Sequence, residues 1–197
     1  MAKKKNKPET MPPTAAKRWK TGNGAITLPV SPLFRLILLF GLYMAIFHVI
    51  LYFLEPTVAP PMQKAITLIV SRLLTGLGIV NTANPDAFLI ILTHDTWNVD
   101  VGCTAIGAMI LYAAFILAYT SSAKAKLSGI LWGIPFIAVM NIVRLLALGW
   151  ITEYFPRTAR LFHDYVWETV FLFIVIGMWF IWIEKVVRHE KNPAVSR

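Results

Sequence analysis

Residues 128–150 read SGILWGIPFIAVMNIVRLLALGW, a run of apolar and small side chains whose only charged residue is Arg144. About 20 apolar residues in a helix cross the hydrocarbon core of a bilayer. The stretch therefore predicts a transmembrane helix, with a kink at Pro135. An arginine inside such a helix is costly, so Arg144 is also the first candidate for a functional residue.

Three more stretches predict membrane spans. The composition agrees, because a soluble domain of this size rarely combines 57% hydrophobic with 15% charged residues. The stretches are residues 33–54 (LFRLILLFGLYMAIFHVILYFL), 104–120 (TAIGAMILYAAFILAYT) and 166–187 (VWETVFLFIVIGMWFIWIEKVV). The first is too long for the apolar core of a signal peptide and is expected to remain as an anchor. We therefore expect an all-α integral membrane protein with a bundle of about four transmembrane helices.

The remaining segments complete the predicted organisation. Residues 1–32 lack a periodic apolar pattern and predict a disordered, basic cytoplasmic tail. Residues 62–80 (MQKAITLIVSRLLTGLGIV) carry a helical apolar stripe interrupted by Lys64 and Arg72. This segment either spans the membrane or forms an amphipathic or re-entrant helix on the outer side. Residues 86–101 are too polar to span and predict extended structure, and residues 188–197 predict a cytoplasmic C-terminal tail.

The distribution of charge predicts the topology. With the N-terminus inside and residues 62–80 not spanning, most basic side chains fall on the inner side and most acidic ones outside, as the positive-inside rule requires. The inner set is Lys3, Lys4, Lys5, Lys7, Lys17, Arg18, Lys20, Lys124, Lys126, Lys185, Arg188, Lys191 and Arg197, and the outer basic set is Lys64, Arg72, Arg157 and Arg160. The same distribution argues against nucleic acid as the partner for the net charge of +9.

This topology predicts that three reactive side chains share one membrane level. Cys103 precedes the second span, Arg144 lies near the outer end of the third, and His163 precedes the fourth. An imidazole can accept the proton of a thiol, and a guanidinium can stabilise a thiolate or the oxyanion of a tetrahedral intermediate. The set therefore suits cleavage of an amide bond just outside the membrane.

Each residue also has a simpler interpretation. A lone cysteine in a helical protein more often packs than reacts, Arg144 can pair with an acid or a lipid phosphate, and His163 can be an ordinary interfacial histidine. His94 is a rival base, and Asp95, Asp100 and Glu168 are candidates to orient His163. With a single cysteine no intrachain disulfide can form, and neither a metal cluster nor a cofactor motif is visible, so no cofactor is expected.

At these same residues the chain resembles the exosortase/archaeosortase family of membrane-embedded cysteine transpeptidase-like enzymes. The resemblance rests on residues 101–105 (VGCTA), on residues 141–145 (NIVRL) and on Phe162-His163, and it covers roughly residues 86–185. It implies catalytic roles for Cys103, Arg144 and His163 and a supporting role for Asn141. The family usually has Ser-Gly after the cysteine, whereas this chain has Thr104-Ala105, and many members have more spans.

The resemblance also implies a function and a substrate. The chain length favours one domain, so residues 33–187 are expected to form a single transmembrane catalytic domain. The resemblance implies a cysteine protease or transpeptidase, and the charge distribution predicts that its site lies on the extracytoplasmic face of the cytoplasmic membrane. Substrates would be membrane-anchored exported proteins that end in a short motif, an apolar helix and a basic tail. The alternative is a non-enzymatic membrane assembly factor or transporter subunit. The motif, the acceptor and the oligomeric state stay open.

Overall fold

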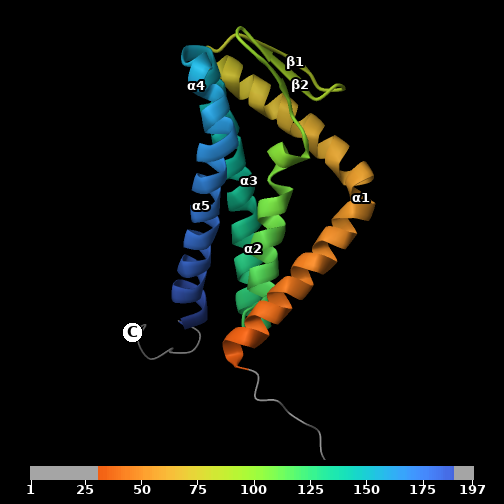
Figure 1. Cartoon of the computed structure of the whole chain (residues 1–197), viewed down its shortest axis with the longest axis vertical. Coiled ribbons are helices and arrows are strands. Elements are labelled where there is room, and N and C mark those ends of the chain that lie inside the picture. The colour runs from red at the N-terminus through yellow and green to blue at the C-terminus, as the bar shows by residue number, and fades with distance from the viewer. Residues whose placement is uncertain (1–30, 189–197) are drawn as a thin grey trace, which may run out of the picture. The chain divides into compact units, whose positions relative to one another are not determined.

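The computed structural model describes residues 31–188, apart from the side chains of Asp164 and Glu168, and these residues belong to one compact unit of the chain. The unit is mostly helical, with one small sheet (Figure 1). Nearly all of both predicted tails, residues 1–32 and 188–197, lies outside the described residues. The helices are α1 (Pro32–Gly76), α2 (Ile106–Ala118), α3 (Ala123–Tyr154), α4 (Pro156–Leu161) and α5 (Trp167–Trp182), and the short turns of helix are η1 (Val101–Thr104), η2 (Phe162–Val166) and η3 (Ile183–Val187).

Helix α1 joins two segments that the sequence predicts as separate. Its 45 residues would extend about 68 Å if straight, well beyond the thickness of a bilayer core. Prolines at positions 56, 60 and 61 lie inside it, and α1 bends midway along its length (Figure 1). Proline removes a backbone hydrogen bond and clashes with the preceding turn, which explains the bend. The helix predicted within residues 62–80 is confirmed up to Gly76, as the second half of α1.

Within residues 31–188, three helices are long and apolar enough to cross a membrane: α1, α3, and the helix from Thr169 to Val187 that includes most of α5. They match three of the four predicted spans. The fourth, residues 104–120, corresponds to α2, whose 13 residues extend only about 20 Å. A bundle of three long apolar helices is therefore shown, and a fourth crossing by α2 stays a prediction.

The helices α1, α2, α3 and α5 alternate in direction (Figure 1). The two ends of the bundle are lined by different residues. At one end Phe40 of α1, Phe115 of α2 and Trp179 of α5 form a cluster of rings, with centroids 4.2 to 6.4 Å apart. At the other end Leu74 of α1 and Leu145 of α3 share a core with the strands. We call this second end the sheet end. The start of α1 and the C-terminal end of α5 are both at the opposite end (Figure 1).

The small sheet is an antiparallel meander of β1 (Asn81–Asn84), β2 (Leu89–Leu92) and β3 (Thr96–Asn98), in the order β1-β2-β3. Ile90 and Leu92 of β2 are buried and pack in the core that contains Leu74 and Leu145. The alternation of buried and exposed residues along β2 is that of a strand with one face on a core. The predicted extended structure within residues 86–101 is thus confirmed in β2 and β3.

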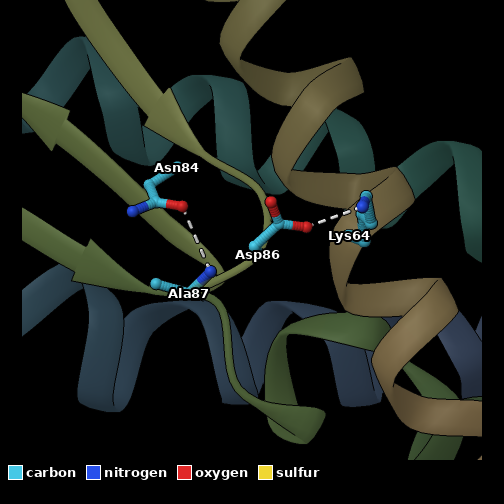
Figure 2. Close-up of polar contacts among 4 residues, drawn as sticks. All are labelled: Lys64, Asn84, Asp86 and Ala87. Atoms are coloured by element: carbon cyan, nitrogen blue, oxygen red, sulfur yellow. Dashed lines mark hydrogen bonds and ion pairs between the residues drawn. The ribbon is translucent and has the colours of Figure 1, made fainter.

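The turn between β1 and β2 is attached to α1. The Asn84 side chain accepts a hydrogen bond from the backbone N–H of Ala87 (3.2 Å), and Lys64 Nζ forms an ion pair with Asp86 Oδ1 (2.7 Å), as Figure 2 shows. Both charged side chains are exposed, at 51% and 83%, so the pair contributes at most about 1 kcal/mol. Buried Ile90 and Leu92 therefore hold the sheet in place more than this surface contact does.

Close packing of α2 on α3 gives a first testable prediction. A Cβ atom added at Gly133 would overlap the ring of Tyr112, which is buried and donates a hydrogen bond to the Gly129 carbonyl (3.1 Å). We expect Gly133→Ala to destabilise the protein by about 1–3 kcal/mol, because an overfilled contact forces the helices apart. The measurement is the thermal unfolding midpoint in detergent. Gly41→Ala is the control, since nothing lies within 4 Å of a Cβ there. An equal midpoint for both variants would contradict the packing.

Candidate functional site

Cys103 lies in a short helical turn at the sheet end, immediately before α2. Asp100 begins this turn, and its carboxylate accepts a hydrogen bond from the Cys103 N–H at 3.1 Å. The Cys103 side chain is buried, with 8% exposed. Ala105 then has φ +59°, the left-handed region that favours glycine. This one residue separates the Cys103 turn from α2, which begins at Ile106.

Asn141 connects this turn to α3. Its Nδ2 donates a hydrogen bond to the Cys103 carbonyl at 2.6 Å, and the side chain is buried, with 1% exposed. Arg144 follows three residues later and therefore lies on the same face of α3. Among the described residues, neither Asn141 Oδ1 nor Arg144 Nε, both buried, has a hydrogen-bond partner. One face of α3 thus positions the cysteine backbone and presents two unused polar groups beside it.

Two cavities meet at Cys103 and His163, and both residues line each of them. The helix-side cavity, of about 870 Å³, lies between η1 and α2 on one wall and α5 on the other, and Arg144 also lines it. The sheet-side cavity, of about 610 Å³, lies between β3, α3 and α4. Cys103, Arg144 and His163, which the sequence could assign only to the same depth, therefore lie around one cavity.

The resting thiol is held in its neutral form. Burial raises the pKa of Cys103 from its ordinary value of 9.0 to about 11, and the charge and hydrogen bonding of the Asp100 carboxylate add to the effect. The positive charge of Arg144 acts in the opposite direction but is outweighed. A thiolate therefore requires a base or a change in the surroundings of Asp100.

Other residues from the sequence analysis are placed less centrally or differently. His94, the rival base, lies in the turn between β2 and β3 and lines neither cavity. Asp95 lines the sheet-side cavity. Asp100, considered as a partner for His163, instead caps the Cys103 turn. The side chain of Glu168 is outside the described part of the chain. The capping role has a sequence signal, an aspartate three residues before the cysteine.

The model of the transmembrane exosortase family matches residues 25–184. No curated protein and no solved structure matches the chain significantly. The family match extends over α1 to α5 and contains every residue of the candidate site.

Replacing Asp100 tests the electrostatics around the thiol. We expect Asp100→Asn to lower the pKa of Cys103 from about 11 toward its ordinary value, because removing a neighbouring negative charge favours the thiolate. The asparagine oxygen can still accept the hydrogen bond of the Cys103 N–H. The measurement is the pH dependence of iodoacetamide labelling, which is unambiguous because the chain has one cysteine. Asp86→Asn is the control. A pKa that stays the same or rises in Asp100→Asn would show that the carboxylate does not act on the thiol.

Proposed function

Since this chain belongs to the transmembrane exosortase family, we propose that it is a cysteine peptidase or transpeptidase that cuts exported proteins at a C-terminal sorting signal. Family membership makes it a multi-pass membrane protein and implies a sorting transpeptidase. The observation that carries the finer proposal is the helix-side cavity, which is lined by Cys103, Arg144 and His163 together. A nucleophile, a proton carrier and a cation around one cavity are the groups that acyl transfer needs.

In the proposed reaction His163 takes the thiol proton as Cys103 Sγ attacks the scissile carbonyl. The resulting oxyanion is stabilised by Arg144, whose buried Nε has no hydrogen-bond partner among the described residues and is therefore available as a donor. His163 then protonates the departing amine, and the C–N bond breaks to leave a thioester on Cys103. An amine acceptor or water next attacks the thioester and restores the thiol. Asn141 holds the Cys103 carbonyl through the 2.6 Å hydrogen bond.

The elevated thiol pKa fits this scheme if deprotonation accompanies attack. A thiol with a pKa of about 11 is almost wholly protonated at neutral pH. A positioned general base is then required at the moment of reaction, and this is the role proposed for His163.

The proposed topology puts the sheet end on the extracytoplasmic face and both termini in the cytoplasm. It is supported by the excess of basic residues in the tails and at the start of α3, where Lys124 and Lys126 lie. A substrate with an apolar helix and a basic cytoplasmic end would share the bilayer with the enzyme. Its helix would lie beside α2 and α5, where Ala108, Leu111 and Leu172 line the helix-side cavity. The scissile bond would then reach Cys103 from the membrane.

One observation favours a second candidate function. The buried, neutral thiol of Cys103 also suits a packing residue in a non-enzymatic assembly factor or transporter subunit. In that case Arg144 would serve as an ion-pairing or transport residue. The two functions can be distinguished, because only the enzyme requires the sulfur atom of Cys103 for its activity.

Cleavage in cells distinguishes them. The reporter is an epitope-tagged exported protein from the same cell that ends in an apolar helix and a basic tail. We expect Cys103→Ala to leave it uncleaved and His163→Ala to slow cleavage by about a hundredfold or more. Arg144→Lys should slow it by at least about tenfold, because lysine keeps the charge but lacks the planar fork. His94→Ala is the matched control and should cleave normally. Normal processing by Cys103→Ala would exclude the peptidase function.

A further inference from the structure

The free edge of β3 presents unused backbone groups. Along an antiparallel pair of strands, residues whose backbone groups bond to the partner strand alternate with residues whose backbone groups point away. Two hydrogen bonds, each 2.8 Å, show which set is which: Val99 N–H donates to Phe88 O, and Leu92 N–H donates to Asp95 O. Trp97 pairs with Ile90 and its backbone groups point toward β2. The backbone groups of the residues on either side of Trp97 therefore point away from the sheet.

The outward groups are the backbone N–H and carbonyl of Thr96 and of Asn98, and two of these four already have a hydrogen-bond partner nearby. The Thr96 N–H donates to Asp95 Oδ1 (2.8 Å), and the Asn98 carbonyl accepts from the Asp100 N–H (3.0 Å). The Thr96 carbonyl and the Asn98 N–H have no partner among the described residues. These two groups flank Trp97, and they are the pair that a parallel neighbouring strand uses. One residue of such a strand donates its N–H to the Thr96 carbonyl and accepts a hydrogen bond from the Asn98 N–H.

These groups border the sheet-side cavity. Its walls include Thr96 and Asn98 on one side and Arg157 of α4 on another, and Cys103 and His163 also line it. At about 610 Å³ it is of the size of ligand-binding cavities.

A buried polar group on α3 lies in the same cavity wall. Thr152 is only 1% exposed, and its hydroxyl has no hydrogen-bond partner among the described residues. A buried hydroxyl without a partner is unfavourable unless a ligand or water satisfies it. Residues of β3 and of α3 with unused polar groups therefore line the same cavity.

We propose that the sheet-side cavity binds the substrate segment that precedes the scissile bond, as an extended strand added in parallel to β3. This inference rests on the proposed function. The direction of β3 supports it, because the chain runs from Thr96 through Asn98 toward Cys103. A parallel peptide runs the same way, so its C-terminal continuation reaches Cys103. The residues along β3 are then those on the acyl side of the bond that is cut.

The arrangement divides the substrate between the two cavities. The acyl segment stays along β3 when the thioester forms, while the apolar helix leaves with the amine from the helix-side cavity. Backbone hydrogen bonds supply affinity that is largely independent of sequence, and the cavity walls select side chains at alternate positions. The segment would remain positioned for attack by an acceptor after the membrane anchor has left.

Disulfide cross-linking tests the strand directly. Since Cys103 is the only cysteine, the Cys103→Ala chain is cysteine-free and holds substrate uncut. Thr96→Cys is added on the β3 edge, and Thr82→Cys is the matched control, because both residues pair with Ile91 and lie on the same face at opposite edges. The probe is the tagged reporter with one cysteine moved through the residues around its cleavage site. We expect Thr96→Cys to cross-link alternate residues before the site. Equal cross-linking from Thr82→Cys, or cross-links only after the site, would overturn the proposal.

A kinetic test uses the backbone donor itself. Asn98→Pro removes the N–H that faces outward, and the loss of one hydrogen bond should slow reporter cleavage about fivefold to tenfold. Ala83→Pro is the control. Ala83 is in β1, at the opposite edge of the sheet, and its N–H also points away from the neighbouring strand. Labelling of Cys103 by a small maleimide, expected to be unchanged, reports whether the site is intact. Normal cleavage by Asn98→Pro would contradict the strand. If the Cys103→Ala variant also cleaves the reporter normally, the proposed function is wrong. The cross-linking test does not depend on cleavage and therefore tests the strand separately.

Discussion

The buried hydrogen bond from Asn141 to the Cys103 carbonyl is the contact on which the rest of the site depends. It links a short turn at the sheet end to the middle of a long helix, and it does so at 2.6 Å between groups that are shielded from water. Breaking it would leave a buried carbonyl unpaired, at a cost of about 1–3 kcal/mol. Because Arg144 is on the same face of α3, this one bond also sets how the cysteine and the arginine lie relative to each other.

The sequence was sufficient for the features that follow from local composition. Apolar runs predicted the three long helices, and the positions of Cys103 and Arg144 along the chain predicted a common level. It could not show that α1 continues through its three prolines, because proline usually ends a helix unless packing compensates for the lost bond. Buried Val70 and Leu74 provide such packing for the second half. The polarity of residues 86–101 indicated a loop but not its pairing, which depends on contacts between distant residues.

The sequence predicted that Cys103, Arg144 and His163 lie at one level, and all three line one cavity. It did not predict the balance of charge around the thiol. The sequence suggested a thiol activated by neighbouring His163 and Arg144, whereas burial and Asp100 dominate at rest and raise the pKa of Cys103. Desolvation depends on how tightly a turn is packed, and a linear pattern does not contain that information. The sequence also could not show whether Cys103, Arg144 and His163 lie near one another, since depth along a helix axis does not reveal which helix faces are in contact. The cavity that Cys103, Arg144 and His163 line supplies that missing information.

The left-handed backbone at Ala105 gives the departure from the related motif a physical meaning. Where the family usually has glycine after the residue that follows the cysteine, this chain adopts φ +59° with a methyl group present, at a cost of about 1 kcal/mol. The lower unfolded-state entropy of alanine does not offset this cost where φ is positive. The turn between the cysteine and α2 therefore keeps its conformation through the packing around buried Ala105.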